Sequence, residues 1–177
     1  MNTTRKFITH STTLAASALL ALFFALPAQA AFTVNADGTV TDIDTGLMWD
    51  QCSQGQSTAT CATGTASTMP WAAALTAATT ANTANYKGYN DWRLPNKNEM
   101  ESIVDIAATN PAINLTAFPA TPVSSIYWSS TTYMPNPAYA WDVNFNDGST
   151  YPSHKAANYA VRLVRSGQLV DTFDALP

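Results

Sequence analysis

A cluster of oxygen-bearing side chains lies in the last third of the sequence and could bind a cation. Asp142, Asn144, Asn146 and Asp147 stand within the phrase DVNFND, and calcium takes its ligands from carboxylate and amide oxygens. The pattern does not fit an EF-hand loop, because its glycine comes one place late and Ser153 stands where a bidentate glutamate is needed. The four residues therefore predict either a calcium site or a solvent-facing strand that ends in a turn.

Tyrosines gather in the same region, among asparagine, serine and threonine residues. Tyrosine mixed with small polar residues makes an adaptable binding surface, and flat aromatic rings suit the faces of sugars. We expect a ligand-binding face between residues 127 and 159. Its predicted members are Tyr127, Tyr133, Tyr139, Asp142, Asn144, Asn146 and Tyr151.

Catalytic constellations are harder to find. Ser129, His154 and Asp142 could be imagined as a Ser-His-Asp triad, but no nucleophile-elbow motif surrounds the serine. A glycosidase needs two carboxyl groups about 5–9 Å apart across a cleft. The carboxylates that could serve, or could instead be turn formers and solvated helix charges, are Asp37, Asp42, Asp44, Glu99 and Glu101. The sequence favours a protein that is not an enzyme, with a carboxylate-based hydrolase as the alternative.

The first thirty residues are typical of a signal peptide. Arg5 and Lys6 precede the apolar run 14–26, and the small-x-small sequence 28–30 follows it. The run is short for a bilayer span, which needs about 20 residues. We expect residues 1–30 to be removed and the chain to be exported, to the periplasm or beyond, with no membrane insertion afterwards.

Charge and cysteine content fit that expectation. The formal net charge of −4 becomes −6 once Arg5 and Lys6 are removed, so nucleic acid and other polyanions are disfavoured partners. Cys52 and Cys61 are the only cysteines, and exported proteins keep disulfides. A local disulfide is predicted between them, and no cofactor is indicated apart from the calcium considered above.

The elements that must position these residues follow from periodicity. Short strands are expected in 32–50, a polar loop in 53–68, and a helix from Pro70 to about Thr80 capped near Ser67 or Thr68. A second helix should begin at Asn96 with a capping box to Glu99. Its apolar stripe would be Met100, Ile103, Val104 and Ala107, and Asn110-Pro111 would end it.

Strands are expected again in 127–133, 141–147 and 159–165. In the second of these, apolar residues alternate with Asp142, Asn144 and Asn146, as in a half-buried strand. Residues 31–167 are predicted to form one α+β domain with an antiparallel sheet, followed by a tail, 168–177. The tryptophans expected in its core are Trp49, Trp71, Trp92, Trp128 and Trp141.

The phrase DWRLP, residues 91–95, stands directly before the second helix. If this segment is extended, Asp91 and Arg93 point to one side as a pair and Trp92 points to the other, while Leu94 stays extended because Pro95 follows. We expect a structural role for the phrase, which delivers the helix onto the sheet.

Several separated phrases together resemble a known family. DGTVTDIDTGLMW, GYNDWRLPNKNEM, YWSST, AWDVNFNDG and YAVRLVRSG occur in this order and resemble the DUF1566 family, also called the Lcl C-terminal domain family, over about residues 33–167. WRLP and WSS are also similar to phrases of the formylglycine-generating enzyme superfamily. Both resemblances imply a C-type-lectin-like fold, with two helices packed on a mostly antiparallel sheet. The reactive cysteines of that enzyme superfamily have no counterpart after Cys61.

The functional hypothesis is an exported, non-catalytic binding or adhesion module. It would recognise an extracellular or envelope glycan or protein through the face made by residues 127–159. The alternatives are a hydrolase or modifying enzyme, and a passive envelope component.

Overall fold

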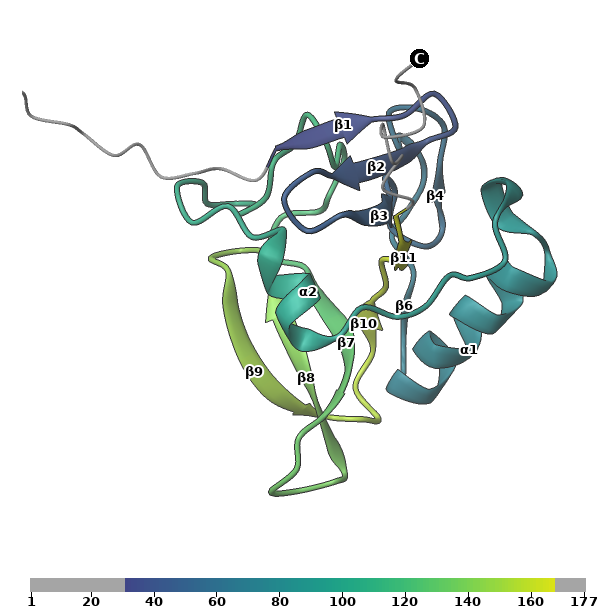
Figure 1. Ribbon diagram of the computed structural model, residues 1–177. Coiled ribbons are helices and arrows are strands. Elements are labelled where there is room, and N and C mark those ends of the chain that lie inside the picture. The colour runs from purple at the N-terminus through teal and green to yellow at the C-terminus, as the bar shows by residue number, and fades with distance from the viewer. Residues whose placement is uncertain (1–30, 168–177) are drawn as a thin grey trace, which may run out of the picture.

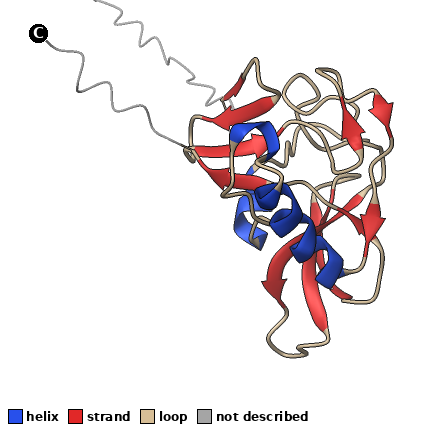
Figure 2. Cartoon of the chain, turned by 90° about the vertical axis from the view of Figure 1, so that its right-hand side faces the viewer, coloured by secondary structure: helices blue, strands red, loops and turns tan. Residues whose placement is uncertain are grey.

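Strands open and close the described chain, and two helices lie between them (Figure 1, Figure 2). The structure is a computed structural model that describes residues 31–167, so the predicted signal peptide (1–30) and tail (168–177) lie outside the described residues. The first strands are β1 (Phe32–Val34), β2 (Thr39–Asp42), β3 (Leu47–Asp50), β4 (Gln56–Ser57), β5 (Thr63–Gly64) and β6 (Thr68–Met69). The helical part holds α1 (Trp71–Thr83), a 3-10 turn (Tyr86–Gly88) and α2 (Lys97–Ser102). The last strands are β7 (Ile126–Thr132), β8 (Tyr139–Asn144), β9 (Ser149–His154), β10 (Tyr159–Ala160) and β11 (Val164–Ser166).

The strands form a four-stranded sheet in the order β1-β2-β3-β11, a five-stranded sheet in the order β6-β10-β7-β8-β9, and the small β4-β5 hairpin. Every pair of these strands is antiparallel except β10 with β7. The predicted α+β class is confirmed. The predicted single strand 159–165 is wrong, since β10 and β11 belong to different sheets. Between them, the carbonyls of Val161 and Leu163 accept hydrogen bonds from the backbone of Gln54 and Asp50, so the chain crosses from one sheet to the other.

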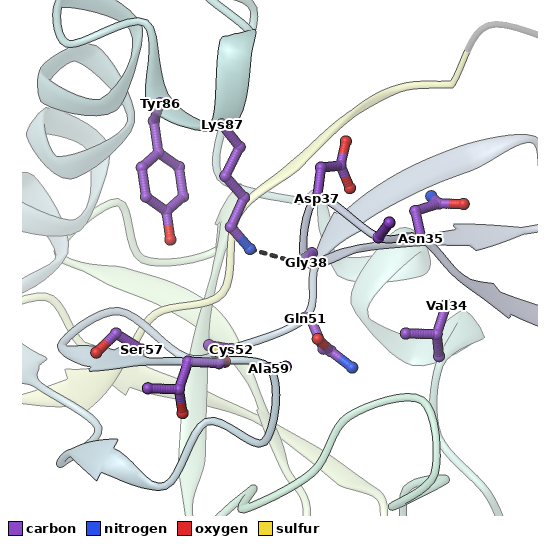
Figure 3. A pocket seen from close by; sticks show the side chains of 12 residues that line it. Val34, Asn35, Asp37, Gly38, Gln51, Cys52, Ser57, Ala59, Tyr86 and Lys87 are labelled. Carbon is purple, nitrogen blue, oxygen red and sulfur yellow. Dashed lines mark hydrogen bonds between the residues drawn. The ribbon is translucent and has the colours of Figure 1, made fainter.

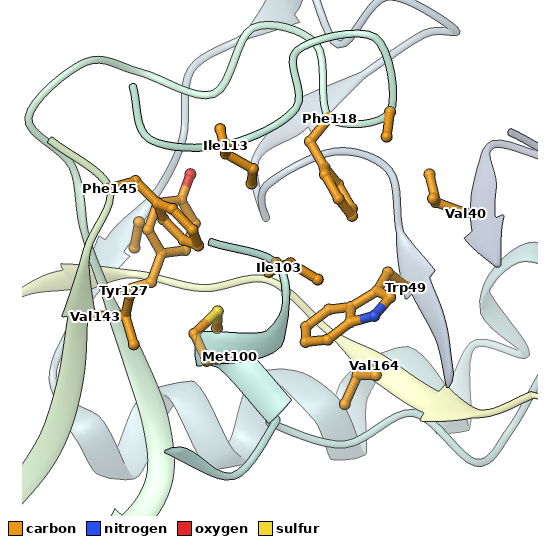
Figure 4. Close-up of a cluster of buried hydrophobic side chains, with 12 residues drawn as sticks. Val40, Trp49, Met100, Ile103, Ile113, Phe118, Tyr127, Val143, Phe145 and Val164 are labelled. Atoms are coloured by element: carbon orange, nitrogen blue, oxygen red, sulfur yellow. The ribbon is translucent and has the colours of Figure 1, made fainter. Parts of the chain in front are cut away.

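Apolar side chains cover both faces of the five-stranded sheet. One cluster lies between this sheet, α2 and the four-stranded sheet, and includes Trp49, Met100 and Tyr127 (Figure 4). The other lies under α1 and includes Trp128 and Ala74. Tyr127 and Trp128 are consecutive in β7 and therefore point to opposite faces. The central strands are thus buried on both sides.

Helix α1 starts at Trp71 with Pro70 at its N-cap, and no side chain caps it, so the predicted Ser67 or Thr68 cap is wrong. It extends past Thr80 to Thr83, and threonine hydroxyls inside it donate to carbonyls four residues earlier, as Thr80 does to Thr76 at 3.1 Å. The residues that it buries are all alanines, which let the helix lie close to the sheet.

Helix α2 has the predicted capping box, in which the Asn96 and Glu99 side chains each accept a backbone N–H of the other residue. The helix ends at Ser102, well before the predicted end at Asn110-Pro111. Val104 instead forms an isolated β-bridge with Ile113. Met100 and Ile103 enter the core as expected, whereas Ala107 is exposed.

The segment 91–95 joins three elements. Trp92 is buried and its ring N–H donates to the Tyr86 carbonyl at 2.9 Å. Arg93 exchanges two backbone hydrogen bonds with Val164, and both of its terminal guanidinium nitrogens donate to the Glu99 carboxylate of α2. Asp91 accepts a hydrogen bond from Arg165 at 2.6 Å. Asp91 and Arg93 therefore do not form the expected pair with each other, because each one binds a different element.

A disulfide joins Cys52 and Cys61, as predicted, and closes the loop that carries β4. Within residues 31–167, no helix has the length and apolar character that crossing a membrane requires.

Candidate functional site

The predicted ligand-binding face is divided between the two sides of the five-stranded sheet. In the β8–β9 pairing, Tyr139 lies opposite His154, and Asp142 lies opposite Tyr151. Paired residues share a face and successive residues alternate. Tyr139 therefore lies on the α2 side of the sheet, and Asp142 and Tyr151 lie on the side that α1 partly covers.

On the α2 side, aromatic rings line the β7–β8–β9 end of the sheet. Tyr133 meets Trp141 edge to face with ring centroids 5.3 Å apart, and Tyr139 meets His154 in the same way at 5.4 Å. The Lys97 ammonium lies 5.2 Å from the Trp141 ring centroid. We call Tyr133, Tyr139, Trp141 and His154 the hairpin aromatic surface. Three of them are half-buried and His154 is exposed, so Trp141 is not the fully buried core residue that was predicted.

The loop between β7 and β8 extends this surface beyond the sheet. Its ends are closed by a hydrogen bond from the Tyr133 N–H to the Tyr139 carbonyl at 2.9 Å. Asn136 bonds to the backbone of both tyrosines and fixes the turn between them. Met134, in the same loop, is 80% exposed. The loop therefore presents an apolar side chain next to the aromatic rings.

Two residues of the predicted face are inside the protein. Tyr127 is 0% exposed, its ring packs on Phe145, and its hydroxyl shares a hydrogen bond of 2.6 Å with Ser53. Asp142 is 1% exposed. These two side chains are not exposed on the predicted face, because β7 and β8 are interior strands of a sheet that is covered on both faces.

Asp142 is buried, and no lysine or arginine of residues 31–167 forms a salt bridge with it. Its neighbour Ser153 hydrogen-bonds to it and accepts a hydrogen bond from the Tyr159 hydroxyl at 3.1 Å. Among the described residues, Asp142 Oδ2 has no hydrogen-bond partner. Burial raises the pKa of Asp142 to about 6, against the smaller opposing effect of the Ser153 hydrogen bond.

The other members of the predicted calcium set close the β8–β9 turn. Asn144 Oδ1 accepts the Asn146 N–H at 2.9 Å, and Asp147 Oδ1 accepts the Ser149 N–H at 3.0 Å. Asn146 Oδ1 accepts from the Ser124 hydroxyl at 3.3 Å. No group of three or more His, Cys, Asp or Glu side chains in residues 31–167 is placed to hold a metal ion.

The groups considered for catalysis also have structural partners. Ser129 Oγ donates to the Trp141 carbonyl at 2.8 Å, and His154 Nδ1 accepts the Ala156 N–H at 3.2 Å. Glu99 binds Arg93, and Glu101 binds Lys97 at 2.5 Å. Asp42 is buried and its Oδ1 accepts the Asp44 N–H at 3.0 Å.

The structure contains a cavity that sequence reasoning did not find. Its volume is about 370 Å³, and it lies between the β1–β2 turn, the disulfide loop and the 3-10 turn (Figure 3). The side chains that carry its chemistry are Asn35, Asp37, Gln51, Ser57, Tyr86 and Lys87. We call it the Lys87 cavity. It is at the lower end of the size range of small-molecule sites.

Lys87 forms the most charged part of this cavity. Its ammonium binds Asp50 Oδ1 at 2.8 Å and also donates to the Gly38 carbonyl. Asp50 is buried, and the pKa of Tyr86 is raised by its own burial and by the Asp50 charge. Asn85 and Lys87 have positive φ angles of 50° and 53°. An asparagine and a glycine on either side of Tyr86-Lys87 were the available sequence signal for this turn.

Comparison with curated proteins gave no match for this chain. The family model of the Lcl C-terminal domain matches residues 38–165. This range runs from the β1–β2 turn to β11 and includes both helices and the five-stranded sheet. The chain therefore belongs to the Lcl C-terminal domain family.

Proposed function

We propose that this protein is an exported, non-catalytic binding or adhesion module that recognises a glycan or a protein through the hairpin aromatic surface. The observation that carries the proposal is the pair of edge-to-face contacts that hold Tyr133, Tyr139, Trp141 and His154 together at one end of the sheet. Rings fixed in this way lose little conformational freedom when a ligand binds.

Two further features support binding rather than hydrolysis. The Lys87 cavity has Asp37 as the single carboxylate among its lining residues, whereas a glycosidase places two carboxyl groups across a cleft. Glu99 forms a salt bridge with Arg93, and Glu101 forms one with Lys97, so both carboxylates already have structural partners.

The proposal includes a C-type-lectin-like arrangement of the two helices and the sheets, and export directed by residues 1–30. The Cys52–Cys61 disulfide supports export, because disulfides persist in oxidising compartments.

The test is a screen of the processed protein on neutral and acidic glycans, in EDTA and again at about 10 mM calcium. We expect Tyr139→Ala to weaken binding of any positive glycan by about tenfold, the cost of losing one aromatic contact. Tyr151→Ala is the matched control, because Tyr151 is an exposed tyrosine on the opposite face of the same hairpin.

The outcomes separate the surfaces and the ligand classes. Loss of binding in Tyr151→Ala but not in Tyr139→Ala would place the ligand on the other face and overturn the proposal. If no glycan binds, a photo-reactive residue at the exposed position of Met134 should cross-link a protein ligand in a manner that Tyr139→Ala abolishes. If binding is the same in EDTA and in calcium, the predicted calcium set has no role in recognition.

A further inference from the structure

We infer that the Lys87 cavity is a second ligand site, which takes a small neutral molecule with neighbouring hydroxyl groups, the size of one sugar residue. It lies among the β1–β2 turn, the disulfide loop and the 3-10 turn, whereas the hairpin aromatic surface is built on β7, β8 and β9. The site does not depend on the proposed function.

Gln51 supplies the main observation. The residue is 3% exposed and lines the cavity. Its backbone is held on both sides, because its N–H donates to the Gly38 carbonyl at 3.2 Å and its carbonyl accepts from Arg162. No hydrogen bond within residues 31–167 reaches its side-chain amide, and neither amide atom is among the fully buried atoms without a partner, so the amide faces the open space of the cavity. An amide that faces a cavity without a protein partner keeps its donor and its acceptor available to a ligand.

The chemistry of that amide selects the ligand. A glutamine amide donates through its nitrogen and accepts through its oxygen, so it matches two neighbouring groups of which one accepts and one donates. Adjacent hydroxyls of a sugar meet this requirement. Ser57 adds a hydroxyl on another side, and Val34 supplies an apolar wall suited to the C–H face of a sugar ring.

The charges around the cavity argue against an anion. The Lys87 charge is balanced by Asp50 at 2.8 Å, and the ammonium uses two of its three N–H donors on Asp50 and Gly38. Burial opposes ionisation of Asp37, but hydrogen bonds from Thr39 and Tyr89 lower its pKa overall. The rim is therefore negative at neutral pH, while Lys87 retains one donor for a neutral oxygen.

Two residues of the cavity wall have an uncommon backbone conformation. Thr58 and Lys87 both line the cavity with positive φ angles, 76° and 53°, a conformation that side chains other than glycine rarely adopt. Gly38 allows the Lys87 ammonium to approach, since a Cβ there would lie 2.9 Å from its nitrogen. Cys52 of the disulfide forms part of the wall.

The experiment follows the side-chain amide resonances of Gln51 in the ¹⁵N-labelled processed protein with its disulfide intact. The probes are the methyl glycosides of glucose, galactose, mannose and N-acetylglucosamine, with sodium glutamate and inorganic phosphate as anions of similar size. For a ligand of this size we expect a Kd of about 1–10 mM. At least one glycoside should shift the Gln51 resonances saturably, and the anions should not.

Gln51→Leu keeps the side-chain volume and removes both hydrogen-bonding groups. We expect at least tenfold weaker glycoside binding and a urea midpoint close to that of the wild type, because the side-chain amide has no protein hydrogen bond to lose. Gln54→Leu is the matched control, three residues along and outside the cavity lining; it should bind normally. Ser57→Ala provides a second variant that does not alter the buried part of the site.

Unchanged glycoside affinity in Gln51→Leu would overturn the inference. It would also fail if the glycosides leave the Gln51 resonances unmoved, or if the anions shift them instead. These wild-type measurements decide the matter even if a variant folds poorly.

Discussion

Asp142 carries a consequence for stability at the scale of a single residue. Its pKa is raised from 3.8 to about 6 by burial, so folding favours the protonated form. The stability that this contributes is fully present below pH 3.8 and is lost as pH rises through about 6. Between these limits the linkage changes the free energy of unfolding by about 3 kcal/mol.

We therefore predict that Asp142→Asn stabilises the protein at pH 7–8 by about 1–3 kcal/mol, because it removes a buried charge without a cation. The variant and the wild type should converge as pH falls to about 4. Urea melts across this pH range measure the difference. A variant that is less stable than the wild type at pH 8 would contradict this prediction, because it would mean that the folded protein stabilises the ionised carboxylate.

Tyr127 and Asp142 also show where residue-level prediction fails. Alternation in 141–147 predicts one solvent-facing and one buried side of the strand, and this holds only for a sheet with one open face. Here α1 and α2 cover opposite faces of the same strands. The adjacent aromatic residues Tyr127-Trp128, both buried, were the sequence signal for burial on two sides.

At the scale of elements, the contact between β11, the 91–95 segment and α2 can be tested. Arg93 holds Glu99 with hydrogen bonds of 2.6 and 2.7 Å, and Glu99 is also part of the capping box. Both side chains are partly exposed, so solvent screening limits the pair to about 1 kcal/mol. We predict that Arg93→Ala lowers the free energy of unfolding by about 1–2 kcal/mol, including lost side-chain packing.

A double-mutant cycle with Glu99→Gln measures this coupling in urea. Lys97→Ala is the control, because Lys97 pairs with Glu101 four residues later within the same helix and such a pair contributes only about 0.3–0.5 kcal/mol. A coupling energy near zero would mean that the backbone bridge between Arg93 and Val164 alone fixes α2 on the sheet.

The two ends of α2 are determined in different ways, the start by local contacts and the end by contacts with a later segment. Its start was predictable because the capping box is made by residues only three apart. Its end was not, since the apolar spacing through Val104 and Ala107 continues past Ser102. The bridge between Val104 and Ile113 replaces the helical hydrogen bonds there, and that contact depends on the packing of a later segment.

At the scale of the whole molecule, Arg162 connects segments far apart in the sequence. It is 0% exposed, and it donates to the Asp50 and Gln51 carbonyls and to the Thr121 hydroxyl. Its guanidinium also lies 4.8 Å from the Phe118 ring centroid. It occupies the crossing between β10 and β11, where the two large sheets are joined.

We predict that Arg162→Met lowers the free energy of unfolding by about 3–5 kcal/mol, because several buried acceptors lose their donor together. Arg162→Lys should recover only part of this loss, since an ammonium cannot reach the same acceptors as a planar guanidinium. Urea unfolding of both variants at constant pH is the measurement. Wild-type stability in Arg162→Met would mean that water replaces the lost donors.

The overall fold was accessible from the sequence because strand patterns, the capping box and the disulfide are local signals. The Lys87 cavity was not, since its walls come from three segments, around residues 34–38, 51–59 and 86–87. None of them carries a recognisable motif alone. The division of the predicted binding face also depended on strand register, which the sequence leaves open.

Because β1 and β11 lie in one sheet, the two ends of the molecule differ. Both ends of the described chain leave from the end that carries this sheet, and the loop between β7 and β8 lies at the far end (Figure 1, Figure 2). A protein fused to either terminus would therefore be attached at the end that carries this sheet, and the hairpin aromatic surface would face away from it. In this geometry, attachment to a larger assembly through a terminus would leave the hairpin aromatic surface accessible to a ligand.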